Sequence, residues 1–147
     1  MNKTRNNELI KLANQALTEQ QASEVLGVSK ILNNGNVEEA YNGSIASLGV
    51  SIAMSGLRPA LAIYYQDKSK SAIRPKANRR SVLDVIGRII TKDAVVLGKP
   101  NWDFSEGERY AENLFRYAIS GEDEKLKTEV IDCAIALKQI VRTYNFV

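Results

Sequence analysis

Apolar residues recur at helical spacing along most of the chain, and one pair of helices joined by a very short turn stands out. Over residues 37–55 the apolar positions step by three or four residues, which places on one helical face Val37, Tyr41, Ile45, Leu48 and Ile52. Gly56 then suits a helix C-terminus, and Pro59 suits the first turn of a second helix over 57–69. Such a tight turn predicts a compact helical hairpin.

The same spacing predicts an N-terminal helix before the hairpin. Residues 6–33 form either one long helix or a helix that breaks near 18–23, preceded by a frayed start at 1–7. The run Asn-Asn-Gly-Asn at 33–36 ends a helix, and Asn36 is expected to be the N-cap of the next one.

Capping patterns predict two further helices after the hairpin. Ser81 opens one of them, with Asp84 at the capping-box position, and Ser105 with Glu108 opens the other. The stretch 94–105 between them is expected to be a loop, and two large aromatic side chains in it should pin it to the body: Trp102 and Phe104.

The most regular apolar stripe comes last and predicts a C-terminal helix. Its residues step alternately by four and three: Leu126, Val130, Cys133, Leu137, Ile140 and Tyr144. Gly121 should end the helix before it. The expected fold is therefore all-α, a single compact bundle of five to six helices forming one domain over 1–147, with 1–7 and 68–80 flexible.

Composition fits a globular domain and gives an expected location. The chain has 147 residues, of which 44% are hydrophobic, enough for one domain with a proper core. A polar start predicts no signal peptide, and no apolar run approaches the roughly 20 residues that span a bilayer. The one cysteine, Cys133, lies in an apolar stripe and is expected to be an inert core thiol. A reducing, cytoplasmic setting is therefore expected.

The absence of histidine argues against an enzyme. Histidine is the commonest general base and metal ligand, and the chain has none. The carboxylates that could replace it stand at expected helix starts, where capping and the helix dipole explain them: Glu106, Glu108, Glu112, Glu122, Asp123 and Glu124. No catalytic residue, metal site, cofactor or small-molecule substrate is expected.

Positive charge is concentrated in the middle of the chain. Residues 58–92 hold nine basic and two acidic residues, a net charge of +7, so the rest carries −4 because the whole chain carries +3. Basic side chains neutralise phosphates, which makes this window the leading candidate for nucleic-acid binding. The expected contact residues are Arg58, Lys68, Lys70, Arg74, Lys76, Arg79, Arg80 and Arg88.

Two neighbouring features could add to such binding or replace it. Tyr65 is a candidate for stacking on bases, whereas Tyr64 is in phase with the core. The run Ser-Glu-Val-Leu-Gly-Val-Ser-Lys at 23–30 is similar to the turn of a DNA-binding helix-turn-helix motif. However, the run at 33–36 should end a helix where a recognition helix would continue, so a helix-turn-helix regulator is kept only as an alternative.

The hairpin and the basic loop together resemble the small helical subunit of the type III-B CRISPR effector, the Cmr complex. The resemblance depends on an apolar helix that ends in a polar-Gly-Leu turn, followed by a helix rich in Ala, Leu and aromatics and then a lysine-containing loop. The residues that carry it are Tyr41, Leu48, Ile52, Ser55, Gly56, Leu57, Ala60, Leu61, Ala62, Ile63 and Tyr64. The terminal helix from Leu137 to Phe146 is also similar, so the resemblance covers about 37–144.

The resemblance implies a non-catalytic role in antiviral defence. Such subunits stack in several copies along the effector and contact the backbone of the guide–target RNA duplex, while a neighbouring subunit cleaves RNA. The implied partners are other Cmr subunits, further copies of this chain, and guide and target RNA; no membrane is implied. A helical protein-interaction scaffold without nucleic acid is the other alternative.

Overall fold

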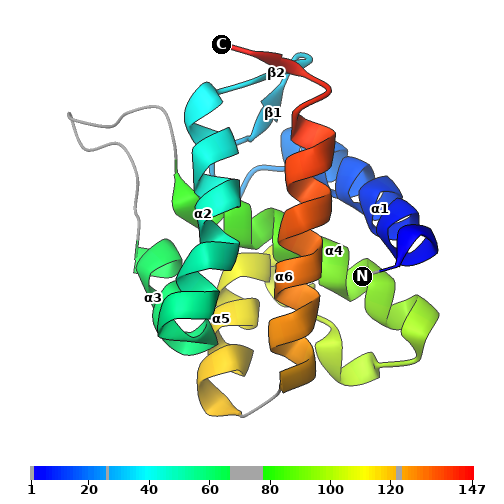
Figure 1. Ribbon diagram of the computed structural model, residues 1–147, viewed down its shortest axis with the longest axis vertical. Helices are drawn as coiled ribbons and strands as arrows, with labels where there is room; N and C mark the ends of the chain where they lie inside the picture. Colours follow the sequence, from blue (N-terminus) through cyan, green and yellow to red (C-terminus); the bar gives the residue numbers. More distant parts are fainter. Residues whose placement is uncertain (1, 26, 67–77, 122–123) are drawn as a thin grey trace.

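Helix α4 (Arg79–Leu97) lies at the centre of the molecule, and the other helices pack around it. Every residue of α4 from position 81 to 90 is buried, as expected of a helix that is covered on all sides. In Figure 1, α2 (Glu39–Ser55) and α6 (Glu124–Val141) stand side by side in front of α4 and cross it. The remaining helices are α1 (Lys3–Ala22), α3 (Leu57–Gln66) and α5 (Tyr110–Ser120).

The computed structural model describes residues 2–25, 27–66, 78–121 and 124–147. Within them, six helices form a compact bundle with one core, which confirms the all-α fold expected from the sequence. The tight turn of the predicted hairpin is also confirmed: α2 ends at Ser55, Gly56 has a φ of 90°, and α3 begins at the next residue. Most of the expected loop at 68–80 lies outside the described residues.

The N-terminal residues differ from the frayed start that was expected. Positions 3–7 form the first turns of α1, and the side chain of Asn2 caps them by accepting a hydrogen bond from the backbone N–H of Arg5 at 2.8 Å. The guanidinium of Arg5 pairs with Asp93 of α4 and Glu129 of α6. The helix ends at Ala22, as in the alternative with a break near 18–23.

The expected helix stop at 33–36 is instead the turn of a β-hairpin. Asn34 and Gly35 have φ values of 53° and 79°, the left-handed conformation that a two-residue hairpin turn requires. They join β1 (Leu32–Asn33) to β2 (Asn36–Val37), and β3 (Asn145–Phe146) pairs parallel with β2. Asn36 is therefore a strand residue, and α2 begins only at Glu39.

The position of this hairpin is also incompatible with a helix-turn-helix motif at 23–30. A recognition helix should follow the turn at 23–30, but the described residues 27–31 contain no helix and β1 begins at Leu32. The run that resembles such a turn is a connection between α1 and the small sheet. The described residues therefore lack the recognition helix that this motif requires.

Neither expected capping box forms. α4 begins at Arg79, two residues before Ser81, and its N-cap is Asn78, whose side chain accepts from the N–H of Arg80 at 2.9 Å. The expected helix at Ser105 is a 3-10 turn, η2 (Glu106–Glu108), and α5 follows it at Tyr110.

The loop between α4 and α5 is shorter than expected because α4 continues to Leu97. Gly98 then adopts the left-handed conformation that ends a helix, and a 3-10 turn, η1 (Pro100–Trp102), follows. Trp102 and Phe104 are both 2% exposed, which confirms that they pin this segment to the body.

The C-terminal stripe is confirmed over its first four positions. Leu126, Val130, Cys133 and Leu137 of α6 are fully buried, while Ile140 and Tyr144 are partly buried. Burial raises the pKa of the Cys133 thiol, which keeps it protonated and unreactive. Gly121 ends α5, as expected.

Candidate nucleic-acid interface

The eight basic residues expected to bind nucleic acid do not share one environment. Four of them, Lys68, Lys70, Arg74 and Lys76, lie outside the described residues. The others are Arg58 in the first turn of α3, Arg79 and Arg80 at the start of α4, and Arg88 in the middle of α4.

Arg88 is part of the core and is not placed to touch a phosphate. Its side chain is 5% exposed, and its Nε donates to Oδ2 of Asp84 at 2.9 Å. Nη1 lies 3.5 Å from Oε1 of Glu19, and the guanidinium lies 4.4 Å from the centre of the Tyr110 ring. These partners balance its charge inside the bundle, so Arg88 is removed from the candidate site.

Arg80 holds the end of α3 against the start of α4. Its Nε and Nη2 both donate to the backbone carbonyl of Tyr65. Its guanidinium also lies 4.1 Å from the centre of the Tyr65 ring, and the Phe115 ring stacks on that ring at 4.7 Å. Two groups this close must occupy opposite faces, so Tyr65 has no open face for a base, contrary to the expectation.

Arg58 supports the other end of α3. Its Nε donates to the carbonyl of Ala118 at 3.2 Å and its Nη2 donates to the carbonyl of Gly121, so it satisfies carbonyls at the C-terminus of α5. A guanidinium used in this way can still present its edge to solvent. Arg58 is therefore a weaker candidate than the expectation implied.

Arg79 is half-buried and precedes Arg80 in the first turn of α4. Its guanidinium is 5.3 Å from the centre of the Tyr64 ring, which is buried as expected of a core residue. The Tyr64 hydroxyl donates to the carbonyl of Ser44 at 2.6 Å, and burial raises the pKa of this hydroxyl. The packed tyrosine fixes the surface over which Arg79 extends.

The start of α4 is firmly anchored to the rest of the bundle. The side chain of Asn78 donates to the carbonyl of Gly27 at 2.8 Å, and its backbone N–H donates to the hydroxyl of Tyr41 at 3.1 Å. Burial raises the pKa of that tyrosine. The first turn of α4 is thus a fixed positive helix end that carries two arginines.

A buried polar cluster beneath this edge was missed by the sequence reasoning. Asp84 was expected to cap a helix, but its carboxyl is 0% exposed and accepts from Nε2 of Gln20 at 2.9 Å as well as from Arg88. Burial raises the pKa of Asp84, and the positive charge of Arg88 opposes that rise. The only signal in the sequence was the (i, i+4) spacing of Asp84 and Arg88 on an otherwise apolar face.

Another ionic cluster, which is partly buried, joins three helices. Arg5 of α1 donates to both Asp93 and Glu129, with 3.0 Å between its Nη2 and either carboxylate oxygen of Glu129. These bonds raise the pKa of Arg5, chiefly through Asp93, while burial raises the pKa of Glu129. This cluster stabilises helix packing. It does not include the basic edge, by which we mean Arg79 and Arg80 at the start of α4.

The described residues contain no group of three or more acidic, cysteine or histidine side chains that could hold a metal ion. No helix in the part of the chain that the structure describes has both the length and the apolar character needed to cross a bilayer. Comparisons with protein-family models, with curated proteins and with solved structures find no significant match to this chain.

Proposed function

We propose that this protein is a non-catalytic nucleic-acid-binding subunit, and specifically the small subunit of a type III-B CRISPR (Cmr) RNA-guided effector. In that role it would stack in several copies and contact the guide–target RNA backbone. The all-α bundle and the tight α2–α3 turn are consistent with the resemblance seen in the sequence. The absence of histidine from the chain supports a binding role.

The observation that carries the proposal is the joining of α3 to α4 at one edge. Because Arg80 donates to the carbonyl of Tyr65, the end of α3 and the start of α4 lie close together. The segment 67–77 between them contains four basic residues and one acidic residue. In the sequence it leads directly to Asn78 and Arg79, where α4 begins with the positive end of its dipole.

Recognition by this edge would depend on charge and shape. Lysine and arginine contacts to phosphates carry no sequence information, and in an RNA-guided effector base pairing with the guide supplies the specificity. Because Tyr65 is covered on both faces, base stacking by this residue is not part of the proposal. The expected binding is therefore salt-dependent and independent of sequence.

Fluorescence anisotropy with labelled single-stranded and duplex RNA tests the proposal. The double variant Lys70→Glu and Arg79→Glu should weaken binding at least tenfold at low salt, because it replaces two attractions with repulsions. The matched control is the double variant Lys3→Glu and Lys11→Glu, which makes the same charge change on exposed residues of α1. Equal losses in both variants, or no binding by the natural chain, would overturn the site.

The assignment to an effector complex needs a separate measurement. The tagged chain, purified from cells that express the neighbouring genes, should carry a guide RNA of uniform length and larger effector subunits. Recovery of the chain without RNA or those subunits would contradict the assignment. RNA binding in the anisotropy assay would then still stand as a separate property.

A second candidate function, a self-associating scaffold, is favoured by the outer face of α2. Residues 40–57 contain no charged side chain, and Val50 and Met54 on this helix are 58% and 82% exposed. Two copies could pack these faces together without burying a charge. Analytical ultracentrifugation should show concentration-dependent association that Met54→Glu abolishes; a monomer at all concentrations would exclude this function.

A further inference from the structure

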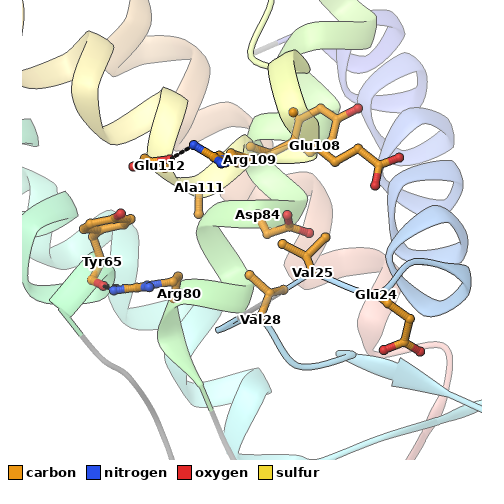
Figure 2. Close-up of a pocket in the computed structure, with 12 residues that line it drawn as sticks. Glu24, Val25, Val28, Tyr65, Arg80, Asp84, Glu108, Arg109, Ala111 and Glu112 are labelled. Carbon is orange, nitrogen blue, oxygen red and sulfur yellow. Dashed lines mark hydrogen bonds and ion pairs between the residues drawn. The ribbon is translucent and has the colours of Figure 1, made fainter.

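A cavity of about 380 Å³ lies beside Arg80, between four segments of the chain. Its walls come from the connection after α1, the end of α3 at Tyr65, the first half of α4 and residues 107–112 around the start of α5 (Figure 2). Gly87 allows these last two walls to approach closely, because a Cβ there would lie 2.9 Å from the carbonyl oxygen of Tyr110. The volume suits a small ligand or one side chain of a partner.

Asp84 is one of the residues that line this cavity, and one oxygen of its carboxyl has no partner. Oδ2 accepts from Gln20 and Arg88, whereas Oδ1 is buried and accepts no hydrogen bond. In Figure 2 this carboxyl lies between Val25 and Glu108. Buried polar atoms in folded proteins nearly always have a partner, so Oδ1 marks a place where a donor is missing.

The charges around the cavity favour a positively charged donor. Its lining holds four carboxylates, those of Glu24, Asp84, Glu108 and Glu112, against the guanidiniums of Arg80 and Arg109. Arg109 lies 3.7 Å from Glu112 and Arg80 is bound to the Tyr65 carbonyl, so both cations are already engaged. Three of the carboxylates also have partners: Glu24 pairs with Lys30, Asp84 with Arg88, and Glu112 with Arg109 and Arg116. Glu108 is exposed, and its negative charge helps to raise the pKa of Asp84.

Apolar groups complete the walls. Val25 and Val28 line the side formed by the connection after α1, and Ala111 lines the side formed by α5. A short aliphatic stem could pack against these side chains while its charged end meets the carboxylates. The cavity therefore combines an apolar passage with a floor at Asp84, whose carboxylate is paired with Arg88 through one oxygen only.

We propose that this cavity binds a protonated amine or a guanidinium group, which donates a hydrogen bond to Oδ1 of Asp84 and lies between this residue and Glu108. The group would reach the cavity on a short aliphatic stem. It could belong to a small polyamine or to a basic side chain of a bound peptide, which share the same chemistry. This ligand differs from the phosphates proposed for the basic edge, so it is independent of the nucleic-acid role.

The primary test is a titration of the ¹⁵N-labelled full chain with butylguanidinium, followed by NMR. Saturable shifts are expected at the backbone amides of Val25 and of residues 107–111, with a dissociation constant of about 1–10 mM, typical of one ion pair with a short apolar stem. Butylurea, which has the same shape without the charge, should bind at least tenfold more weakly. Equal responses to the two probes would overturn the proposal, as would no response at these amides.

One variant at the cavity and a matched control distinguish binding in the cavity from general attraction of the cation to surface carboxylates. Glu108→Gln should weaken butylguanidinium binding about threefold to tenfold, because it removes one charged partner. Glu106→Gln is the matched control: this residue is exposed and two positions away, and it does not line the cavity. Equal weakening by both variants would contradict the proposed site.

A substitution of Asp84 tests most directly whether its unpartnered Oδ1 takes part in binding. Asp84→Asn should abolish the saturable shifts, and the same spectra report whether the variant is folded. If it is unfolded, the comparison of Glu108→Gln with Glu106→Gln decides the proposal. Spermidine and acetyl-Gly-Arg-Gly-amide then distinguish the two sources of the cation, since the one that fits should bind more tightly than butylguanidinium.

Discussion

Helix α4 uses arginine in two opposite ways within ten residues. At its start, Arg79 extends over the packed ring of Tyr64 at the edge of the bundle. In its middle, Arg88 is 5% exposed and is enclosed by Asp84, Glu19 and Tyr110. One residue type therefore serves a surface at one end of the helix and the core at the other.

The difference shows why a count of charges along a sequence overstates a binding surface. Arg88 adds to the positive window of the sequence, yet its charge is cancelled locally by carboxylates of α1 and α4. Arg79 and Arg80 are both half-buried, but the guanidinium of Arg80 is bound to the backbone carbonyl of Tyr65. Only charges whose partners leave room for a ligand belong to an interface.

The largest expected effect comes from removing the buried arginine. Arg88→Ala would leave the carboxylate of Asp84 in the core with only Gln20 as a donor, which should lower the free energy of unfolding by about 3–5 kcal/mol. Urea denaturation at pH 7, followed by circular dichroism, measures the change. Arg79→Ala is the matched control and should lower it by about 1 kcal/mol or less. Similar losses at both positions would erase the contrast between the two ends of α4.

A smaller effect is expected where α4 meets the start of α5. Gly87→Ala should lower the free energy of unfolding by about 1–3 kcal/mol, because the new methyl group would lie 2.9 Å from the Tyr110 carbonyl oxygen. Gly49→Ala in α2 is the control, since a Cβ there meets nothing within 4 Å. The control should raise stability by about 0.5–1 kcal/mol through helix propensity. Thermal and urea unfolding of both variants would show changes of opposite sign; a shared sign would contradict the close approach.

The fold was largely predictable because helical periodicity is a local property. The α2–α3 turn and the buried face of α6 follow from residue spacing and from Gly56, and the structure confirms both. The hairpin at Asn34–Gly35 was missed, although Asn-Gly is a common hairpin turn, because its flanking strands have only two residues each. β3 comes from the far end of the chain, and such long-range pairing leaves no local pattern.

The candidate site was less predictable because its geometry depends on tertiary contacts. The sequence indicated a basic window, but it could not show that Arg80 binds the carbonyl of Tyr65 or that Phe115 covers that ring. The cavity at Asp84 was hidden for the same reason. Its walls come from four separate segments, and its decisive feature is one oxygen without a partner.

The pH dependence of stability tests the environment of Asp84, the buried partner of Arg88 in α4. Because burial raises the folded-state pKa of Asp84 above its ordinary 3.8, the unfolded chain loses this proton first as the pH rises. The associated stability is fully present below the unfolded pKa and is lost as the pH rises through the folded pKa. The stability of the natural chain relative to Asp84→Asn should therefore fall as the pH rises from below 3.8 towards neutral. Urea titrations across this range test the sign; a relative stability that rises with pH would mean that Arg88 and Gln20 outweigh burial.

The smallest expected effect concerns Arg79 at the start of α4. It links the contrast between Arg79 and Arg88 to the proposed function. If Arg79 contacts one phosphate, Arg79→Gln should reduce the slope of log binding constant against log salt by about 0.7 for single-stranded RNA. The change should be the same for RNAs of different sequence, because a phosphate contact reads no base. Lys11→Gln, an exposed change on α1, is the matched control and should leave the slope unaltered. Anisotropy titrations between about 50 and 200 mM salt would resolve it. An unchanged slope for Arg79→Gln would place this arginine, like Arg88, among the residues that serve the fold, and the interface would then have to lie in the basic segment between α3 and α4.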